Sequence, residues 1–424
     1  MLAQLAQVLN SDAFCEAHRV KPSDFTRTRR LSLPTVVAFF LQLSGGCSLQ
    51  NALDQFFMSL RGQAEFGRAV TKSALSQARK KLKPSAFSAL NRLWVEGWHV
   101  CMAYERWCGL RVVAADGTCV RVARWAENIN AYGWGPCRDG TVVMARCVAL
   151  FSTATRQVLE VVVGRYDEGE RAQLLRALGA LKRDDVLVLD RGYPAWWMFA
   201  LLQARNIAFC VRIEDCGWPV VRQFLAGKDD DWVIAPHRLS ARARKQLLTL
   251  GFAQAQEVAL RLIRVRLPNG KWEVLATSLL NEQRYPACEF AAFYGQRWGV
   301  EESFKLIKHR LDLEGFSGEL PHAIEQEIYA KALMHNIAQA LCSEAAGQLE
   351  DEKRANWQVN RAYAVKNVGV VVVNWFKGCK HQLARITQSL IDTLAITLEQ
   401  IRPGRTFPRK HAIGGAQRSR KAYR

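Results

Sequence analysis

The chain has 424 residues, 49% of them hydrophobic, and can bury a large core in about two to four domains or in one domain with a large insertion. Its formal charge of +20 favours a polyanionic partner, although solubility charge or an acidic protein partner would fit the same excess. The 12 Cys are scattered without Cys-x2-Cys pairs or zinc-ligand spacing, so we expect reduced cysteines in a cytosolic protein. Because the sequence has no signal-peptide pattern and no long apolar run, we expect the protein to be neither exported nor membrane-spanning.

Residues 1 to about 105 predict an all-helical N-terminal region. Apolar residues recur at helical spacing in residues 2–9, 33–43 and 49–60, with Gly45 and Gly46 as a break. A further short helix is expected after Thr71 or Ser73, either of which can cap it. Its exposed face is predicted to carry four bases, Arg79, Lys80, Lys81 and Lys83. A short basic helix after a tight turn suits a major-groove reader of DNA, but a solvated surface helix has the same pattern.

From residue 110 the pattern changes to short apolar runs that predict a mixed α/β sheet. The first predicted strand ends in Asp116, and residues 142–151 and 157–166 form an antiparallel pair. A helix over residues 170–181 precedes a buried strand that ends in Asp190, and a helix to residue 205 and a strand over 207–213 follow. Three antiparallel strands followed by alternating helix and strand are typical of a mixed sheet.

Residues 214–287 break this alternation and predict a β-rich insertion. The acidic run at residues 229–231 marks a loop, and residues 257–267 and 271–280 form a hairpin turning at residues 268–270. Helices are expected again at residues 322–346 and 382–401, with an apolar run at 368–376 between them. The last 23 residues carry eight bases and no acid, which predicts a disordered tail that binds phosphate.

One helix over residues 294–308 places four polar side chains on one side. These are Tyr294, Arg297, Glu301 and Lys308. Apolar residues at helical spacing beside this ridge would fasten the helix to a core, so the ridge should face outward or into a cleft. A solvated helix face is the plainer interpretation of the same pattern.

Asp116 and Asp190 on one sheet, with Glu301 from a helix packed on it, can hold two divalent ions for phosphoryl transfer. Oxygen ligands favour Mg²⁺ or Mn²⁺ over zinc. Arg297 and Lys308 would then bind phosphate oxygens, and Tyr294 would supply a hydroxyl donor. Taken singly, each Asp also fits an ordinary turn sequence at a strand end.

These residues resemble the DDE transposases of bacterial insertion sequences, specifically the insertion-sequence-four family. The resemblance rests on Asp116-Gly117-Thr118, on Asp190-Arg191-Gly192-Tyr193 and on the Tyr-x2-Arg-x3-Glu-x6-Lys pattern from Tyr294 to Lys308. It implies a ribonuclease-H-like core in residues 106–213 and 288–345, interrupted by the insertion at 214–287. Residues 1–105 would be a helical DNA-binding region, and 346–424 a helical region with the basic tail.

The resemblance further implies cut-and-paste movement of an insertion sequence, often through a hairpin, at terminal inverted repeats. Asp116, Asp190 and Glu301 would bind two Mg²⁺ or Mn²⁺ ions, and the partners would be double-stranded DNA and a second copy in a homodimeric synaptic complex. Arg79, Lys80 and Lys81 would contact DNA, and Trp272 would stack on a flipped base, although packing is the plainer role of a hairpin Trp. The protein would be cytoplasmic and associated with the bacterial nucleoid.

Two alternatives stay open at this point. A catalytically silent DNA-binding relative would keep the basic surfaces but would not need all three carboxylates. A structure-selective nuclease of the same fold would keep the carboxylates but would not need Tyr294, Arg297 and Lys308.

Overall fold

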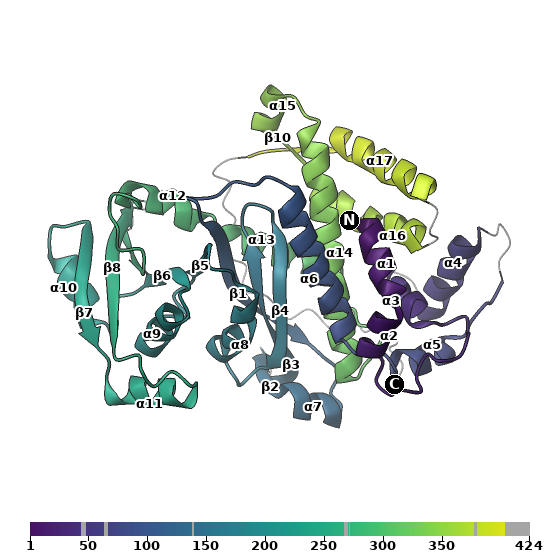
Figure 1. The fold of residues 1–424 in the computed structure, drawn as a ribbon, viewed down its shortest axis with the longest axis horizontal. Coiled ribbons are helices and arrows are strands. Elements are labelled where there is room, and N and C mark those ends of the chain that lie inside the picture. Colours follow the sequence, from purple (N-terminus) through teal and green to yellow (C-terminus); the bar gives the residue numbers. More distant parts are fainter. Residues whose placement is uncertain are drawn as a thin grey trace.

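A mixed β-sheet runs through the centre of the molecule (Figure 1). The computed structural model describes residues 1–43, 48–62, 67–137, 140–266, 270, 272–376 and 380–402. Within these residues the sheet has nine strands in the order β2-β3-β1-β5-β6-β9-β8-β7, with β4 also paired to β3. The strands are β1 Arg111–Arg121, β2 Trp134–Cys137, β3 Gly140–Ser152, β4 Gln157–Arg165, β5 Asp185–Leu189, β6 Ala208–Ile213, β7 Asp231–Arg238, β8 Glu257–Arg266 and β9 Trp272–Thr277.

The five core strands have the ribonuclease-H-like arrangement that the resemblance implies. β4, β3 and β1 are antiparallel neighbours, and β1, β5 and β6 are parallel neighbours. Their strand runs are rich in Val, Leu and Ala and are buried on both faces, as parallel strands covered by helices require. The predicted fold class is therefore confirmed.

The insertion extends this sheet. β9 pairs antiparallel with β6, and β8 and β7 follow it, so the predicted hairpin of β8 and β9 is confirmed and continues the core. Two helices, α10 Pro219–Ala226 and α11 Ala241–Thr249, were not predicted there. The acidic run is only partly a loop, because Asp231 opens β7 and pairs with Ile263. Residues 267–269 and 271 of the predicted turn lie outside the described residues.

Helices cover both faces of the core. α8 Glu170–Ala177, the short 3₁₀ turn Leu178–Ala180 and α9 Trp196–Ala204 pack on one face. The other face carries the 3₁₀ turn Ala287–Glu289, α12 Phe290–Gly295 and α13 Trp298–Arg310. α7 Ala126–Tyr132 packs on β3 and β4, while α6 Ser85–Cys101 and the long α14 Pro321–Gly347 lie along β4.

The helix predicted over residues 294–308 is interrupted near its start. The amides of Gln296 and Arg297 donate to carbonyls only three residues earlier, at Phe293 and Tyr294, and this tight turn separates α12 from α13. Tyr294 and Arg297 are buried, at 6% and 3% exposure, so of the two predicted orientations of the ridge these residues do not have the outward one.

Helices from both ends of the chain pack together. The N-terminal helices are α1 Leu2–Leu9, α2 Asp12–His18, α3 Leu33–Gln42, α4 Leu49–Arg61 and α5 Lys72–Arg79. The C-terminal elements are α15 Asp351–Asn356, β10 Trp357–Val359, α16 Arg361–Phe376, α17 Lys380–Ile396 and β11 Leu398–Gln400, with β10 and β11 forming a separate two-stranded sheet. α16 contacts α1, α3, α4 and α14, so the predicted terminal regions share one core.

The predicted cap of the basic helix is confirmed, because the Thr71 hydroxyl accepts a hydrogen bond from the amide of Ala74 at 3.2 Å. Gly45, Gly46 and the basic tail from residue 403 lie outside the described residues. Across the described ranges, no helix has the length and apolar character needed to cross a membrane.

Candidate active site

Asp116 lies in β1, and Asp190 directly follows β5, the parallel neighbour of β1. The pairing of β1 with β5 matches Val112 to Val186 and Ala114 to Val188, and the same register continued by two residues would bring Asp116 opposite Asp190. Alternation along a strand places both on the face where Val112 and Val188 pack under α12. Asp116 is mid-strand, not at a strand end as predicted, because β1 continues to Arg121; Asp190 directly follows β5 as predicted.

Glu301 approaches this face from α13 and is bound to Arg297. The Nη2 atom of Arg297 donates to Oε1 of Glu301 at 3.0 Å. The Arg297 side chain is only 4% exposed, and its Nε and Nη1 atoms are buried with no hydrogen-bond partner among the described residues. Burial opposes the charge of Arg297, but Tyr294, Asp190 and Glu301 raise its pKa. A buried cation with spare donors thus lies among the carboxylates.

The Asp116 carboxyl has a raised pKa, as expected for a buried carboxylate that lacks a close counter-charge. Burial raises its pKa to about 6, against a hydrogen bond from the Gly117 amide at 2.9 Å and the charge of Arg297, which both lower it. The neighbouring carboxylates of Glu301 and Glu170 add to the rise. A bound cation would therefore stabilise the ionised form of Asp116.

Tyr294 and Lys308 contact the backbone of the two strands that carry Asp116 and Asp190. The Tyr294 hydroxyl donates to the carbonyl of Leu189 at 3.2 Å, and burial raises the pKa of this hydroxyl. Lys308 Nζ donates to the carbonyl of Cys119 at 3.0 Å. Tyr294 is therefore buried beside the end of β5, and in this structure its hydroxyl is engaged with the Leu189 carbonyl.

Sequence reasoning missed a fourth carboxylate, Glu170, at the first position of α8. Its Oε1 accepts a hydrogen bond from Arg146 Nη1 at 2.8 Å, and its carboxylate lies directly behind Gly117. No sequence signal could have found it, because an acidic residue in the first turn of a helix is ordinary helix chemistry.

The donor set suits a hard divalent cation, since Asp116, Asp190 and Glu301 offer only oxygen. Among the residues that the structure describes, no three His, Cys, Asp or Glu side chains converge as a metal-holding group. Glu301 is ion-paired with Arg297 in this structure, so the chemistry of the donors suits a divalent cation while their arrangement here holds none.

Trp272 lies at the same edge of the sheet as Asp190. β9 begins at Trp272 and runs antiparallel to β6, with Val274 opposite Ile213 at the end of β6. Strand geometry then separates Trp272 from Asp190 by about 10 Å across the sheet and about 10 Å along it. The indole is 53% exposed, and the guanidinium groups of Arg264 and Arg266 lie 5.9 and 5.8 Å from its ring. An exposed aromatic ring between two cations suits a nucleotide base.

The prediction that Arg79 lies on an exposed basic face is wrong. Arg79 is buried, and each of its guanidinium nitrogens donates a hydrogen bond. Its Nη2 donates to Oε1 of Glu327 and to the carbonyl of Ala323, both at 2.7 Å, and its Nε and Nη1 donate to Gln326 and Ser317. The helical period turns residue 79 toward α14, so it cannot bind a phosphate. Lys80 and Lys81 stay exposed.

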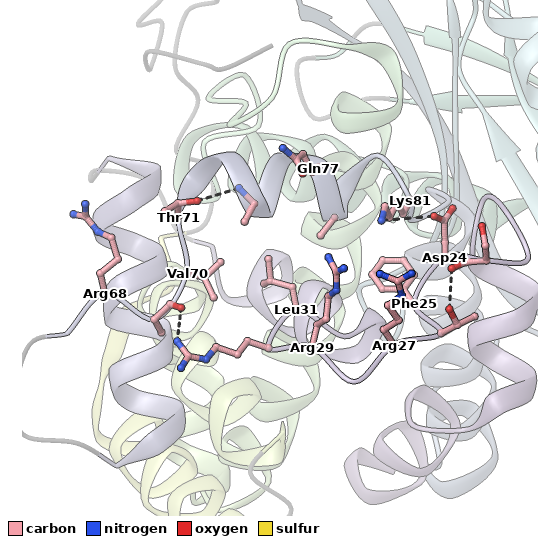
Figure 2. A pocket seen from close by; sticks show the side chains of 16 residues that line it. Asp24, Phe25, Arg27, Arg29, Leu31, Arg68, Val70, Thr71, Gln77 and Lys81 are labelled. Atoms are coloured by element: carbon pink, nitrogen blue, oxygen red, sulfur yellow. Dashed lines mark hydrogen bonds and ion pairs between the residues drawn. The ribbon is translucent and has the colours of Figure 1, made fainter.

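A basic pocket of about 670 Å³ lies beside α5 (Figure 2). The loop at residues 23–31 forms one wall and α5 the other, with Arg68 near one end and Lys81 near the other. Its basic residues are Arg27, Arg29, Arg30, Arg68 and Lys81. Four of these bases come from loops without periodicity, which is why the sequence pattern did not single them out. The pocket can attract an anion next to Lys80 and Lys81.

Comparisons with known proteins identify the family of the chain. A family model described as "Transposase DDE domain" matches residues 107–337, a segment that includes Asp116, Asp190 and Glu301. The chain is 24% identical over 327 residues to the transposase InsG for insertion sequence element IS4 of Escherichia coli (strain K12), covering 73% of this chain and 70% of that protein. It is 26% identical over 173 residues to the putative transposase y4zB of Sinorhizobium fredii (strain NBRC 101917 / NGR234), covering 39% of this chain and 45% of that protein.

A solved structure, a piggyBac transposase synaptic complex with hairpin DNA, is similar with a TM-score of 0.43 and 9% identity. The alignment covers 96% of this chain and 87% of that chain.

Proposed function

Because the chain belongs to the DDE transposases, related to the transposase of IS4, we propose that Asp116, Asp190 and Glu301 are its catalytic carboxylates in cut-and-paste movement of an insertion sequence. The reaction would be phosphodiester hydrolysis at the terminal inverted repeats, followed by strand transfer to target DNA. The observation that supports the proposal is the parallel β1–β5 pairing, which ends two residues before Asp116 and Asp190, together with the charge of Glu301 acting on Asp116.

DDE transposases use divalent metal ions, and we propose two Mg²⁺ or Mn²⁺ ions held by Asp116, Asp190 and Glu301. Bound there, the ions would activate water or a 3′-hydroxyl and stabilise the leaving oxygen. The chain's own part is to hold Asp116 and Asp190 near each other and to release Glu301 from Arg297. The raised pKa of Asp116 supports this role, because a carboxyl that is costly to ionise alone gains most from a cation.

Arg297 is proposed to exchange partners when DNA binds. Within the described chain its buried Nε and Nη1 donors have no partner, so both can donate to a phosphate oxygen. Such a bond would loosen its hold on Glu301. Tyr294 and Lys308 would meanwhile hold the backbone beside Asp190 and Asp116 in place, which revises their expected direct contact with phosphate.

The partner is proposed to be double-stranded DNA, both as terminal repeats and as target. Lys80, Lys81 and the basic pocket would bind the phosphate backbone, and Trp272 would stack on a base extruded near the cleaved end. Two copies would act together in a synaptic complex, since an element has two ends to cut.

The test is a cleavage assay with purified protein, Mg²⁺ and DNA ending in the repeats that flank the coding region. Asp116→Ala, Asp190→Ala and Glu301→Ala should each abolish strand cleavage while leaving end binding largely intact. Glu302→Ala is the matched control: its side chain is 63% exposed, its nearest ion-pair distances are 3.7 Å, and it should cleave normally.

Each alternative predicts a different result in this assay. Retained cleavage in any one of the three variants would refute the assignment of the carboxylates. Tight end binding without cleavage by the unmutated chain would indicate a silent DNA-binding relative, and cleavage without joining would indicate a nuclease.

A further inference from the structure

The start of α8 contacts both segments that carry the catalytic aspartates. Glu170 lies against β1 at Gly117, the residue after Asp116. A Cβ atom at Gly117 would lie 2.6 Å from Cδ and Oε1 of Glu170, closer than packed atoms approach, so only glycine leaves room for this carboxylate. An added Cβ at Gly117 would therefore push the Glu170 carboxylate out of its present position.

Arg146 holds the Glu170 carboxylate in this position from β3. Its Nη1 donates to Oε1 of Glu170 at 2.8 Å, and its Nε donates to the carbonyl of Tyr166 at 3.2 Å. The guanidinium carbon also lies 4.6 Å from the centre of the Tyr166 ring. With three contacts the guanidinium has one orientation, and Glu170 is held with it.

Arg171, the next residue of α8, holds the loop that follows Asp190. Its Nε donates to the carbonyl of Gly192 at 3.1 Å, and its Nη2 donates to the carbonyl of Pro194 at 3.0 Å. Within the same loop the amide of Tyr193 donates to the carbonyl of Asp190 at 3.1 Å, and the Tyr193 ring is buried. A shift of Arg171 would thus be passed to Asp190 through a short, hydrogen-bonded turn.

We propose that Glu170 and Arg171 form a positioning clamp that sets the spacing of Asp116 and Asp190 and, through it, the affinity of the site for divalent metal. This inference rests on the proposed function of the two aspartates. Glu170 and Arg171 act from the opposite face of the sheet and do not bind the metal themselves. The paired residues of β1 and β5 end at Ala114 and Val188, two residues before Asp116 and Asp190, so the contacts of Glu170 and Arg171 would brace the aspartates where the ladder no longer holds them.

The first test measures Mn²⁺ binding to the full-length protein on its repeat DNA by electron paramagnetic resonance, alongside Mn²⁺-dependent cleavage. Arg171→Ala should weaken Mn²⁺ binding about tenfold, while cleavage at saturating Mn²⁺ stays within about threefold of the unmutated rate. Arg171→Lys, which can still donate to one carbonyl, should recover part of the loss. Arg176→Ala is the control, because Arg176 lies on the same helix and pairs with Glu168 at 2.8 Å, away from the loop.

The second test uses the close approach at Gly117. Gly117→Ala should weaken Mn²⁺ binding, because the new methyl group displaces Glu170 or β1. Combining Gly117→Ala with Glu170→Ala empties that space, so the double variant should bind Mn²⁺ more tightly than Gly117→Ala alone. Glu170→Gln keeps the shape and can still accept from Arg146, and should stay within about threefold of the unmutated affinity.

Two results would overturn the clamp: unchanged Mn²⁺ affinity in Arg171→Ala, or a Gly117→Ala defect that Glu170→Ala does not relieve. A fall in maximal cleavage rate at unchanged Mn²⁺ affinity would also contradict it. Failure of the proposed function is separate, because it would show as unchanged Mn²⁺ binding in Asp116→Asn.

Discussion

Two Arg–Glu pairs each contain a buried arginine, but among the described residues only one of the two arginines has hydrogen-bond partners for all of its guanidinium nitrogens. Arg79 and Glu327 join α5 to α14, and every guanidinium nitrogen of Arg79 has a partner. Arg297 and Glu301 begin α13 beside the aspartates, and there a single hydrogen bond at 3.0 Å leaves Nε and Nη1 of Arg297 without partners in the described part of the chain. Both arginines are equally hidden from solvent, at 4% and 3% exposure.

The difference separates a structural pair from a pair kept for another partner. An unsatisfied buried polar group costs about 1–3 kcal/mol, so the two donors of Arg297 that are unpartnered within the described chain, beside three carboxylates, are consistent with a further partner. The Arg79 pair offers nothing further to bind and fastens the N-terminal helices to the core. In the Arg297 pair, Nε and Nη1 of Arg297 have no partner among the described residues, and we propose that a phosphate binds them and that a metal binds the Glu301 carboxylate.

The largest expected effect comes from making the same substitution in both pairs. Arg79→Met removes the closest counter-charge of the buried Glu327 carboxylate, whose remaining partners are Ser317 and Lys331, and should lower the free energy of unfolding by about 3–5 kcal/mol. Arg297→Met removes a poorly satisfied cation and leaves the partly exposed Glu301, so the loss should be no more than about 1 kcal/mol. Urea unfolding measures both, and equal losses would remove the distinction between the pairs.

The second prediction concerns pH. The folded pKa of Asp116, about 6, lies above its ordinary value, so stability is greatest where the carboxyl is protonated and is lost as pH rises through about 6. In metal-free buffer Asp116→Asn should therefore stabilise the protein at pH 8 by about 1–3 kcal/mol, and the gain should disappear toward pH 4.

Asp185→Asn is the control for this measurement, because Asp185 is buried with both oxygens bound to Arg111 at 2.6 Å. That variant should be destabilised at both pH values. Thermal unfolding at pH 4, 6 and 8 gives the comparison, and a pH-independent effect of Asp116→Asn would contradict the raised pKa.

Two tryptophans differ in a related way, because one is buried in the core and the other is exposed. Trp375 is 2% exposed, and Trp375→Ala should cost stability in the manner of a core cavity, about 3 kcal/mol or more. Trp272 is exposed, and Trp272→Ala should leave stability and first-strand nicking almost unchanged while slowing hairpin formation about tenfold, or about 1.4 kcal/mol.

A substrate without the flipped base should partly restore Trp272→Ala, since the cost of unstacking is then absent. If nicking and hairpin formation fall together, or if the variant unfolds, Trp272 is a packing residue.

The smallest change in unfolding free energy is expected for Lys80 and Lys81, which follow Arg79 in the chain. Lys80→Ala and Lys81→Ala together should keep the unfolding free energy within about 0.5 kcal/mol but weaken binding to all duplex DNA. The slope of log K against log salt should shrink by about 0.9 for each phosphate that the variant no longer neutralises. Lys353→Ala, on exposed α15, should leave the slope unchanged. An unchanged slope in the double variant would mean that this helix does not touch DNA.

The sequence by itself determined the features that depend on local periodicity and turn chemistry. Alternating and continuous apolar runs identified the core strands, and the position of Asp190 directly after β5 followed from where that run stops. The Thr71 cap was equally local, since it needs only the next three residues. Fold class and candidate carboxylates could therefore be predicted before any packing was known.

The tertiary structure alone decided which charged side chains are buried and which are available. Arg79 is buried by Glu327, 248 residues away, and no local pattern signals such a contact. The break before α13 and the burial of Tyr294 follow from packing against the sheet. The insertion continues the sheet because β9 pairs with the edge of β6 that the core strands leave open. Glu170 looked like an ordinary helix start, and only the close approach of α8 to Gly117 placed it behind Asp116. These features depend on contacts between distant segments, which periodicity along the chain does not encode.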